Sequence, residues 1–474
     1  MDCALKNQNC GGCPLLGVEY ARQLQQKEAR VRRLLGGYAP VEPIRGMAEP
    51  WHYRNKAIST FAAGPHGTLV SGIYAEGTHR VLPVERCLLQ DEQIDRTVDA
   101  VRAAARACRY APYEEDRGTG LLRHVLVRRA FATGQLMAVL VTAQPVLPGA
   151  ARFVHALLAE AAARGVTVTT VVQNYNPRRT SAVLGTQEKV LYGKGFIVDT
   201  LCGNTYALSP RSFYQINPVQ TEVLYGLAVQ AAQLTGRETV IDAYCGIGTI
   251  GLTAAPHAAA VTGVEKNADA VRDAIGNARH NHLANARFYA ADATEWLAAA
   301  AAQGARADVL FLDPPREGST PAFLQAAARM APARIVYVSC CPETQARDLA
   351  LLTRAGYRAE RCWPVDMFPH TVHVETVVQL VLRESPVHIN IGVDVEELVQ
   401  DKRGQATYPQ IKEYVLEHSG LKVSSLYIAE VKQKCGIIER ENYNKPKSED
   451  SRQPICPPEK EAAIKEALEY FGMN

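Results

Sequence analysis

ETVIDAYCGIGTIGLTAAPHAAAVTGVE, residues Glu238–Glu265, is the stretch that decides the fold. Thr239–Ile241 predicts a buried strand, and the residues after it predict a glycine-rich turn that opens a helix. The turn has the spacing Gly-x-Gly-x-x-Gly from Gly246 to Gly251, and a second apolar run ends at Glu265, about 20 residues beyond the first glycine. This combination predicts a nucleotide-binding strand–helix–strand unit.

The glycines of this turn have two physical uses. Glycine adopts backbone angles that a side chain would penalise, and it lets a ligand approach the main chain closely. Glu265 is placed to bind a ribose, and Asp242 ends the first strand beside the turn. A dinucleotide and S-adenosylmethionine both fit these residues, so this stretch alone leaves the ligand open.

Size and composition limit the class of protein. A chain of 474 residues is too long for one ordinary core, so several domains are expected. The hydrophobic fraction of 47% and the charged fraction of 21% are typical of soluble globular proteins. No apolar run approaches the roughly 20 residues that cross a bilayer, and the N-terminus lacks the apolar core of a signal peptide. We therefore expect a cytoplasmic monomer that does not bind membranes.

The charge is nearly balanced, because the net value is only +3. Overall electrostatics therefore says little about partners. Basic clusters at Arg30–Arg33, Arg123–Arg129 and Arg178–Arg179 are each typical of a solvated surface. Together they favour a nucleic-acid substrate, because such clusters can follow a phosphate backbone.

Twelve cysteines in a cytosolic chain indicate metal binding or catalysis rather than disulfides. Cys3, Cys10 and Cys13 lie close together in the sequence, and Cys87 follows in the segment VERCLLQ. Four thiolates suit a [4Fe-4S] cluster, and tetrahedral zinc accepts the same ligands. Free cysteines are the third interpretation, although three thiols near a terminus would invite oxidation.

Residues 51–200 predict an α+β domain. Helices are predicted near 91–106 and 149–163. Arg54, Asn55 and Lys56 are candidate substrate contacts at its start. Its predicted strands, rich in β-branched and aromatic residues, are WHYRNKAIST, HGTLVSGIYAEG, LLRHVLVRRA, GQLMAVLVTA and TVTTVVQNYN.

The residues that lead into the nucleotide-binding unit carry several amides. Pro218 predicts the start of a helix in the segment SPRSFYQINPVQ. Gln215, Asn217 and Gln220 flank that start, and their amides can read a base edge or a cofactor carboxylate. Isolated amides are more often surface residues, but their position just before the nucleotide-binding unit makes these three candidate ligand contacts.

Strands and helices alternate after Glu265, which predicts a doubly wound sheet. VDMFPH and HVETVVQLVL are predicted as its final pair of strands. Ligands of such sheets bind beyond the carboxyl ends of the strands. The residues predicted at that edge are Asp242, Glu265, Asp292, Asp313 and Cys340.

Cys340 is followed by Cys341 and Pro342, and the segment PHTVHVE brings Glu375 to an edge of the sheet. A lone cysteine there is usually an inert core thiol, but a thiolate, a carboxylate and a methyl donor in one cleft suit alkylation of a pyrimidine carbon. Uracil C5 is too weak a nucleophile to take a methyl group until a thiolate adds at C6. A base must then remove the C5 proton so that the thiolate can leave. We therefore expect Cys340 to be the nucleophile and Glu375 the base.

The segments VIDAYCGIGTIGL, FLDPPREG, YVSCCPET and PHTVHVE resemble successive motifs of the RNA (uracil-5-)-methyltransferases. WHYRNKA, LLRHVLVR, QNYN and SFYQINPVQ resemble the central-domain signatures of that family, so the resemblance covers residues 1–384. It implies a Rossmann-like class I methyltransferase domain that uses S-adenosylmethionine. The N-terminal cysteines resemble the [4Fe-4S] ligands of the 23S rRNA branch, in the short form without a leading TRAM domain. The implied product is 5-methyluridine in 23S rRNA.

The resemblance also implies roles for single residues. Cys340 matches the family nucleophile and Glu375 its base. Where the family usually has Ser-Cys-Asn-Pro, this chain has Cys341 in place of the asparagine, which leaves Cys341 as a second candidate nucleophile. The expected contacts of S-adenosylmethionine or the active site are Gln215, Tyr244, Gly246, Glu265, Asp292 and Asp313. The expected cluster ligands are Cys3, Cys10, Cys13 and Cys87.

Residues 385–474 lie outside the resemblance. VHINIGVDVEELVQ is linker-like, and TYPQIKEYVLEHSG and SSLYIAEVKQKCG predict two amphipathic helices joined by a short turn. Ser424 and Ser425 are candidate caps of the second helix. We expect a small helical domain that contacts RNA or another protein, with a purely structural tail as the alternative. The predicted domains are residues 1–90 with the iron-sulfur segment, 91–210 for the central α+β domain, 211–384 for the methyltransferase domain and 385–474 for the helical extension.

Three classes of function compete on the sequence. The first is methylation of 23S rRNA, with tRNA as the alternative target. The second is an NAD-type oxidoreductase with an electron-carrying cluster, which does not explain Asp313-Pro314-Pro315 or the presence of Cys340 with Glu375. The third is a non-enzymatic nucleic-acid-binding protein, against which the intact Cys340 and Glu375 argue.

Overall fold

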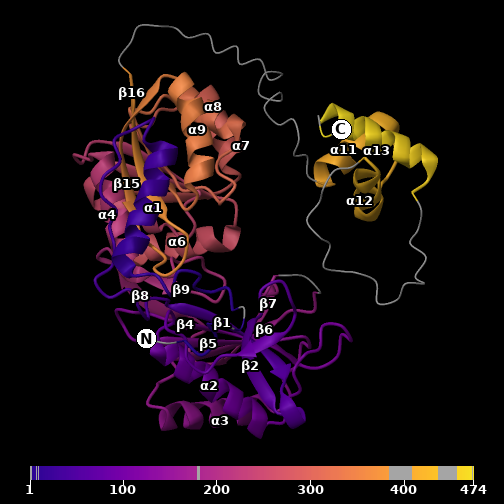
Figure 1. Cartoon of the computed structure of the whole chain (residues 1–474). Coiled ribbons are helices and arrows are strands. Elements are labelled where there is room, and N and C mark those ends of the chain that lie inside the picture. Colours follow the sequence, from indigo (N-terminus) through magenta and orange to yellow (C-terminus); the bar gives the residue numbers. More distant parts are fainter. Residues whose placement is uncertain are drawn as a thin grey trace. The chain divides into compact units, whose positions relative to one another are not determined.

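The computed structural model describes residues 3–6, 8, 10–178, 182–383, 408–435, 456–471 and 473. The chain separates into two compact units, Met1–Pro386 and Val387–Asn474. The first unit contains two seven-stranded sheets, which occupy its upper and lower parts in Figure 1. We call them the upper and the lower sheet.

The upper sheet has the strand order β12-β11-β10-β13-β14-β16-β15. Strands β10 to β14 are parallel to one another, whereas β16 is antiparallel to both β14 and β15. Its strands are β10 (Thr239–Ala243), β11 (Ala260–Glu265), β12 (Ala286–Ala290), β13 (Val309–Leu312), β14 (Arg334–Ser339), β15 (Tyr357–Val365) and β16 (Glu375–Leu382). Its helices are α4 (Pro218–Ala232), α5 (Thr249–Ala254), the 3-10 turn η2 (Ala255–His257), α6 (Ala268–His280), α7 (Ala293–Ala302), α8 (Pro321–Met330) and α9 (Pro342–Arg354).

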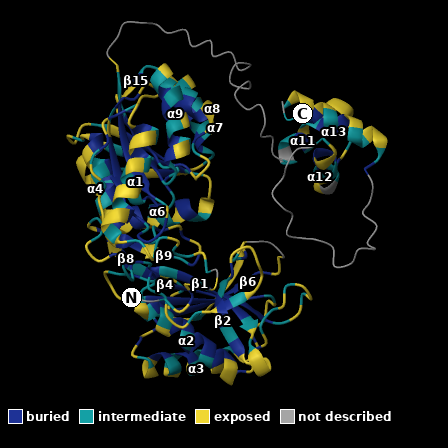
Figure 2. Ribbon diagram, viewed as in Figure 1, coloured by how far each residue is buried: buried dark blue, intermediate teal, exposed yellow. Residues whose placement is uncertain are grey.

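Alternate residues of the parallel strands face opposite layers of helices. Val240 belongs to a core shared with α4, α5 and α6, whereas Ile241 belongs to a core shared with α7, α8 and α9. The central strands β10, β13 and β14 are therefore buried on both faces, as the dark blue strands of Figure 2 show. The doubly wound sheet that the sequence predicts is confirmed.

The prediction that VDMFPH forms a strand is wrong. Strand β15 ends at Val365, so VDMFPH lies almost wholly beyond it. The chain instead turns through residues 366–374, because Pro369 has no N–H for a ladder and His370 has a positive φ of 65°. HVETVVQLVL does form a strand, β16, which starts at Glu375. Residues 366–374, called the 366–374 loop below, therefore lead directly into β16.

The lower sheet has the strand order β3-β2-β1-β4-β5-β6-β7, in which only the β5–β6 pair of these strands is parallel. The five predicted strand segments correspond to β1, β2, β4, β5 and β6, whereas β3 is too short and β7 too exposed to show an apolar pattern. Helices α2 and α3 pack on one face of the sheet (Figure 1). The bounds are β1 (Lys56–Ala63), η1 (Pro65–Gly67), β2 (Leu69–Tyr74), β3 (Val81–Pro83), α2 (Glu92–Ala107), β4 (Leu122–Arg129), β5 (Leu136–Thr142), α3 (Ala150–Ala163), β6 (Thr170–Tyr175), β7 (Gln187–Tyr192) and the separate hairpin β8 (Ile197–Leu201) with β9 (Asn204–Leu208).

The second unit contains α11 (Tyr408–Ser419), α12 (Ser425–Lys434) and α13 (Pro458–Tyr470). These helices share one apolar core, to which Ile411, Ile428 and Ile464 belong. Ser424 caps α12 as predicted, because its side chain accepts a hydrogen bond from the N–H of Tyr427 at 3.3 Å. The predicted linker VHINIGVDVEELVQ lies outside the described residues.

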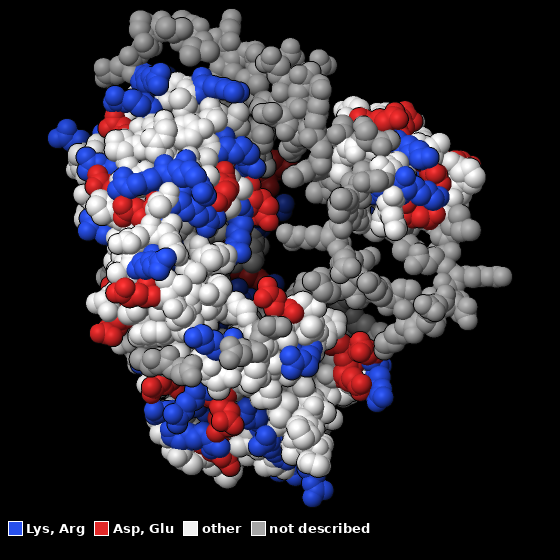
Figure 3. Space-filling view, in the orientation of Figure 1, with Lys and Arg blue, Asp and Glu red and all other residues white. Residues whose placement is uncertain are grey.

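Basic and acidic side chains are interspersed over the face shown in Figure 3. Some of them form ion pairs, such as Arg30 with Glu343 at 2.7 Å. The predicted basic cluster on β4 is not a solvated stripe, because the strand lies inside the sheet and buries Arg123 and Arg128. Arg179, from another predicted cluster, lies outside the described residues.

Candidate active site

The glycine turn joins β10 to α5 and packs against Asp242. Gly246 and Gly248 have φ angles of 54° and 85°, which favour glycine. The N–H of Gly251 donates to Asp242 Oδ2 at 2.7 Å, and a Cβ on Gly251 would lie 2.8 Å from the same oxygen. A Cβ on Gly246 would instead meet nothing within 4 Å in the described part of the chain. Packing therefore requires glycine at Gly251, whereas Gly246 faces open space that a ligand can enter.

Glu265 ends β11 beside this turn. Its Oε2 accepts a hydrogen bond from the N–H of Gly246 at 3.2 Å, and its Oε1 accepts one from the N–H of Asn267 at 2.8 Å. A carboxylate has about four acceptor positions, so two main-chain bonds leave capacity for the hydroxyl groups of a ribose. The geometry therefore suits the role that the sequence predicts for Glu265.

Three carboxyl groups gather around the turn. Burial, with Asp313 and Glu265 nearby, raises the pKa of Asp242 to about 7 against the hydrogen bond from Gly251. Burial likewise raises the pKa of Asp313 to about 7. Within the described ranges, Asp242 Oδ1 is buried without a hydrogen-bond partner. A group of buried acids attracts a cationic ligand and repels phosphate, so this site suits the sulfonium and ammonium of S-adenosylmethionine better than a dinucleotide.

Asp292 and Tyr244 stand at the same edge but have structural partners. Asp292 caps α7, because its Oδ1 accepts hydrogen bonds from the N–H groups of Thr294 and Glu295 at 2.9 and 3.3 Å. Tyr244 has a positive φ of 63°, and its ring lies 5.3 Å from the ring of Phe323. Helix capping alone is thus enough to explain why an acid stands at Asp292.

Cys340 and Glu375 become neighbours through the register of two strands. Ser339, the last residue of β14, pairs with Thr376 of β16. Because the pair is antiparallel, the residue after Ser339 lies beside the residue before Thr376. Cys340 is half-buried and Glu375 is buried at this point. The nucleophile and the base expected from the sequence therefore share one position of the sheet.

Electrostatics link the pair to Asp313 and Arg316. Burial, with Glu375 and Asp313 nearby, raises the pKa of the Cys340 thiol to about 11, while Arg316 opposes the shift. Burial, with Asp313 nearby, raises the pKa of Glu375 to about 8, and Arg316 again opposes the shift. Arg316 was not among the predicted site residues, although it directly follows the motif Asp313-Pro314-Pro315, which is the signal that could have found it.

Cys341 occupies a different environment. It is the N-cap residue of α9, where its side chain makes no capping hydrogen bond to the described residues. Its thiol lies 3.7 Å from Glu343 Oε2, and Glu343 in turn binds Arg30. The thiol beside Glu375 is that of Cys340, so the geometry favours Cys340 over Cys341 as the nucleophile.

Two of the three predicted amides have structural roles. Asn217 is buried, and its side chain accepts from the N–H of Gln220 at 3.2 Å and donates to the carbonyl of Met367 at 3.0 Å. Gln220 is buried and donates to the carbonyls of Arg45 and Asp366. The prediction that Asn217 and Gln220 read a ligand is therefore not supported. Pro218 does begin α4 as predicted.

Gln215 and the Arg54–Lys56 segment meet where the two sheets join. Asn55 is buried, and its side chain donates to the main-chain carbonyl of Gln215 at 2.9 Å. The Asn55 side chain thus connects the two sheets structurally and does not serve as a substrate contact. Burial, with Arg128 nearby, lowers the pKa of Lys56 to about 8. Gln215 itself is half-buried, as a ligand contact at a cleft can be.

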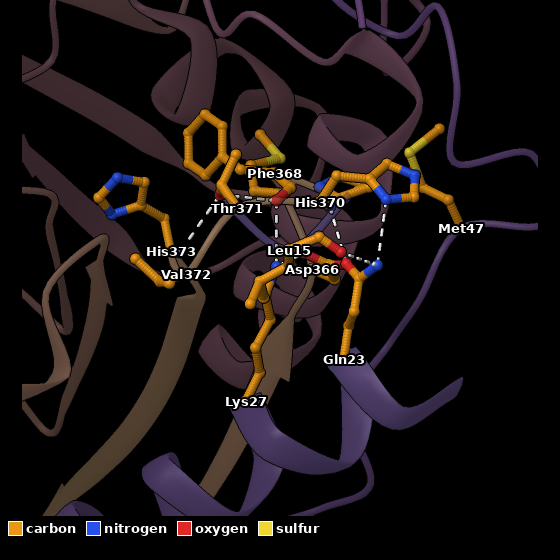
Figure 4. Close-up of polar contacts among 12 residues, drawn as sticks. Leu15, Gln23, Lys27, Met47, Asp366, Phe368, His370, Thr371, Val372 and His373 are labelled. Carbon is orange, nitrogen blue, oxygen red and sulfur yellow. Dashed lines mark hydrogen bonds and ion pairs between the residues drawn. The ribbon is translucent and has the colours of Figure 1, made fainter. Parts of the chain in front are cut away.

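Helix α1 (Tyr20–Leu35) holds the 366–374 loop that precedes Glu375 (Figure 4). Lys27 Nζ lies 2.6 Å from Asp366 Oδ1 and also donates to the carbonyl of Phe368 at 3.0 Å. Gln23 Oε1 accepts from the N–H of His370 at 2.9 Å. Removing one partner of a buried ion pair typically costs about 3–5 kcal/mol. The position of this loop, and hence of the start of β16, therefore depends on α1.

The four N-terminal cysteines lie in one neighbourhood. Burial, followed by the nearby thiols of Cys10, Cys3 and Cys87, raises the pKa of Cys13 to about 11, while Arg54 opposes the shift. Among the described residues, no group of three or more His, Cys, Asp or Glu side chains is arranged to hold a metal ion. The thiols are thus close enough to affect each other without forming a ligand sphere.

The helices of the described ranges are all too short or too polar to cross a membrane.

Comparison with known proteins gives consistent matches. The family described as tRNA (Uracil-5-)-methyltransferase matches residues 185–383. An uncharacterized RNA methyltransferase of Bacillus cereus is 43% identical over 382 residues, which are 80% of this chain and 82% of the relative. An uncharacterized RNA methyltransferase of Listeria monocytogenes is also 43% identical, over 80% of this chain and 83% of the relative.

A solved structure matches a larger part of the chain than the family model does. It is the tRNA (uracil-54, C5)-methyltransferase of Pyrococcus abyssi in complex with S-adenosyl-L-homocysteine, with a TM-score of 0.65 and 26% identity over 78% of this chain and 86% of that chain. The oxidoreductase and the non-enzymatic alternatives do not account for these matches. The chain therefore belongs to the tRNA (uracil-5-)-methyltransferase family and is an S-adenosylmethionine-dependent RNA methyltransferase with a class I fold.

Proposed function

We propose that the chain methylates uracil C5 in 23S rRNA, to give 5-methyluridine, through covalent addition of the Cys340 thiolate to uracil C6. The observation that carries this proposal is the antiparallel pairing of β14 with β16, from which Cys340 and Glu375 emerge side by side. One uracil ring must meet a nucleophile at C6 and a base at C5. A thiol and a carboxyl group on adjacent strand ends satisfy that requirement.

The proposed reaction proceeds in polar steps. The Cys340 thiolate forms a bond to C6, and the electron pair of the C5–C6 double bond moves into an enolate whose C5 is nucleophilic. S-adenosylmethionine, when bound, supplies the methyl group as an electrophilic sulfonium. Glu375 then takes the proton from C5, the C5–C6 double bond forms again, and the C6–S bond breaks. Cys340 is thereby restored as a thiolate.

The proton states of the two groups fit this sequence of steps. With pKa values of about 11 and 8, Cys340 and Glu375 both hold protons at neutral pH when no cationic ligand is bound. A positive charge bound at the adjacent acidic turn lowers both pKa values, because it stabilises the ionised forms. Loss of the proton from Cys340 is thus favoured once the cationic cofactor is present.

The glycine turn and its carboxylates form the proposed cofactor site. Glu265 binds the ribose hydroxyls with its remaining acceptor positions, and Gly246 lets the ligand approach the main chain. The acids near the turn balance the positive charge of the sulfonium and the ammonium. The remaining proposed contacts are Gln215, Tyr244, Asp292 and Asp313.

We further propose that Cys3, Cys10, Cys13 and Cys87 hold a [4Fe-4S] cluster with a structural role. Their chemistry fits the group, because four thiolates are its usual ligand set. The effect of the Cys10, Cys3 and Cys87 thiols on the pKa of Cys13 supports a shared neighbourhood for the four ligands. Zinc is the alternative occupant.

The cysteine group is also the basis for proposing 23S rRNA as the substrate. The tRNA alternative is favoured by a different observation, the fold similarity to an enzyme whose name gives a tRNA substrate. We propose a cytoplasmic monomer, in which the second unit contacts RNA or another protein.

Cells that lack this protein should lose 5-methyluridine from 23S rRNA and keep it in tRNA. Nucleoside mass spectrometry of the two purified RNA classes, followed by mapping of the 23S rRNA position, checks this expectation. Complementation with the Cys341→Ala variant should restore the modification, whereas Cys340→Ala should not. Loss confined to tRNA would support the alternative substrate instead.

RNA that contains 5-fluorouracil should trap a covalent adduct on Cys340 when S-adenosylmethionine is present. Fluorine at C5 cannot leave as a proton, so elimination fails and the C6–S bond persists. Denaturing gel electrophoresis detects the adduct. Cys340→Ala should abolish it, and Cys341→Ala should retain it within about threefold of the wild type. An adduct that depends on Cys341 alone would reassign the nucleophile.

Replacement of the proposed base should stall the reaction after methyl transfer. Glu375→Gln should transfer about one methyl group per chain and then remain bound to the RNA, with turnover lowered about 10²–10⁴-fold. Rapid-quench measurement of the burst and of the adduct checks this result. Glu343→Gln is the matched control, because Glu343 contacts the Cys341 thiol and Arg30 rather than Cys340, and it should turn over normally. Multiple turnovers by Glu375→Gln at the wild-type rate would exclude Glu375 as the base.

Protein purified without oxygen should be brown and contain about four iron ions and four sulfides per chain. Cys87→Ser should bleach the visible absorption and make the N-terminal residues more sensitive to protease, since metal binding couples to folding. Cys108→Ser, at a buried cysteine of the same domain, is the control and should keep the colour. Stoichiometric zinc without iron would contradict the cluster assignment.

A further inference from the structure

A cavity of about 640 Å³ opens on the lower sheet of the first unit. Residues from β1, β2 and β4 and from the segment before β4 line it, among them Thr60, Tyr74, Tyr113, Arg123 and His124. Thr60 and His124 lie opposite each other in the β1–β4 register. None of these residues belongs to the proposed methyl-transfer or cluster sites.

The cavity lies on the face of the lower sheet opposite to α2 and α3. Phe61 and Val125 alternate with Thr60 and His124 along their strands, and they belong to the core under those helices. Ile58, on the cavity side, packs against the core that extends into the methyltransferase domain. Figure 1 shows α2 and α3 on the side of the sheet away from that domain. The cavity therefore lies on the side of the lower sheet that faces the methyltransferase domain.

Arg123 forms a buried, polar part of the cavity wall. It is buried, and its guanidinium donates to the carbonyl of Asn176 at 2.9 Å and to Glu115 Oε1 at 3.2 Å. The same guanidinium lies over the ring of Tyr113, 5.0 Å from its centre. Its Nε atom is buried and finds no hydrogen-bond acceptor in the described segments. A buried donor of this kind is normally satisfied, so it points to an acceptor supplied by a ligand or a water molecule.

His124 contributes an imidazole ring, which can both donate and accept hydrogen bonds. Burial, with Arg123 nearby, lowers its pKa to about 4, so the imidazole is neutral at physiological pH. Its Nδ1 lies 3.0 Å from Thr60 Oγ1. A neutral imidazole carries one donor and one acceptor nitrogen. The ring of Tyr74 at the same cavity lies 5.8 Å from that of His79, which is exposed.

These features select for a flat, uncharged ligand with a polar edge. Arg123 is paired with Glu115, and Asp116 also lines the cavity, so a phosphate would meet two carboxylates there. A nucleobase instead presents aromatic faces, which stack on tyrosine rings, and an edge of donors and acceptors, which matches Arg123 and His124. A volume of about 640 Å³ lies in the range of pockets that hold small ligands.

We propose that this cavity binds one unpaired base of the substrate RNA, other than the uracil that is methylated, and so helps the enzyme to choose its RNA. The chain from Thr60 at the cavity back to Asn55, which directly precedes β1 and binds the main chain of Gln215, spans about 17 Å at roughly 3.4 Å per residue. One extended segment therefore connects the cavity to Gln215, a proposed contact of the methyl-transfer site. The proposal rests on an RNA substrate but not on whether that RNA is ribosomal or transfer RNA.

Binding of purified 23S rRNA and tRNA to the full-length protein tests the proposal. Tyr113→Ala should weaken binding of the true substrate about 5- to 150-fold, the usual effect of losing one base-stacking ring. Tyr113→Phe should stay within about twofold of the wild type, because it keeps the ring. Tyr192→Ala, an exposed ring on β7 outside the cavity, is the matched control and should bind normally. Equal binding by Tyr113→Ala and the wild type would overturn the proposal.

Abasic substitutions identify the bound base. In a synthetic fragment that spans the methylated uridine, one abasic position outside the target should weaken binding to the wild type but not weaken binding to Tyr113→Ala further. Equal loss in both proteins at every position would also overturn the proposal. If the melting temperature shows that Tyr113→Ala is unfolded, His79→Ala at the exposed ring takes its place in both measurements. Binding is measured apart from methyl transfer, so failure of the proposed reaction shows as absent 5-methyluridine with the binding pattern unchanged.

Discussion

The antiparallel pairing of β16 with β14 is the constraint on which the catalytic arrangement depends. In a fully parallel sheet, Cys340 at the end of β14 would stand beside the end of the neighbouring strand. Strand β16 runs the other way, so its first residue, Glu375, stands there instead. The proposed nucleophile and base are therefore positioned by the hydrogen-bond ladder of the sheet, which holds their separation more firmly than two independent loops would.

Placing several carboxyl groups at this edge of the sheet has an electrostatic cost. Burial raises the pKa of Glu375 to about 8 and the pKa values of Asp313 and Asp242 to about 7, because a charged carboxylate is disfavoured in a low dielectric. Repulsion from the nearby Asp313 adds to the shifts of Glu375 and Asp242. A cationic ligand relieves both effects at once. The acidity of the glycine turn and the protonated state of Cys340 are thus both consistent with the proposed site, in which the positive charge of the cofactor would stabilise the ionised groups.

The sequence predicts the parts of this site that are encoded locally. The glycine spacing, Glu265 and the strand before Cys340 follow from short-range patterns, and the structure places them at one edge of the sheet. Asn217 and Gln220 were misjudged, because a polar side chain in a sequence does not reveal whether its partner is a ligand or a buried carbonyl. The prediction that VDMFPH forms a strand was wrong for a related reason. Its apolar residues suit a strand, but the side-chain partners of Asp366 lie on α1, more than three hundred residues away.

Helix α1 shows how residues that are distant in the sequence constrain the position of Glu375, the proposed base. Gln23 binds His370 across 347 positions of sequence, and Leu15, two residues after Cys13, donates to the carbonyl of His370 at 3.0 Å. The cysteine segment is therefore tied to the 366–374 loop, which leads into Glu375. Addition, methyl transfer and elimination all move electron pairs, so an electron carrier has no step to serve in the proposed reaction. A cluster at these cysteines would act on catalysis only through the position of this loop.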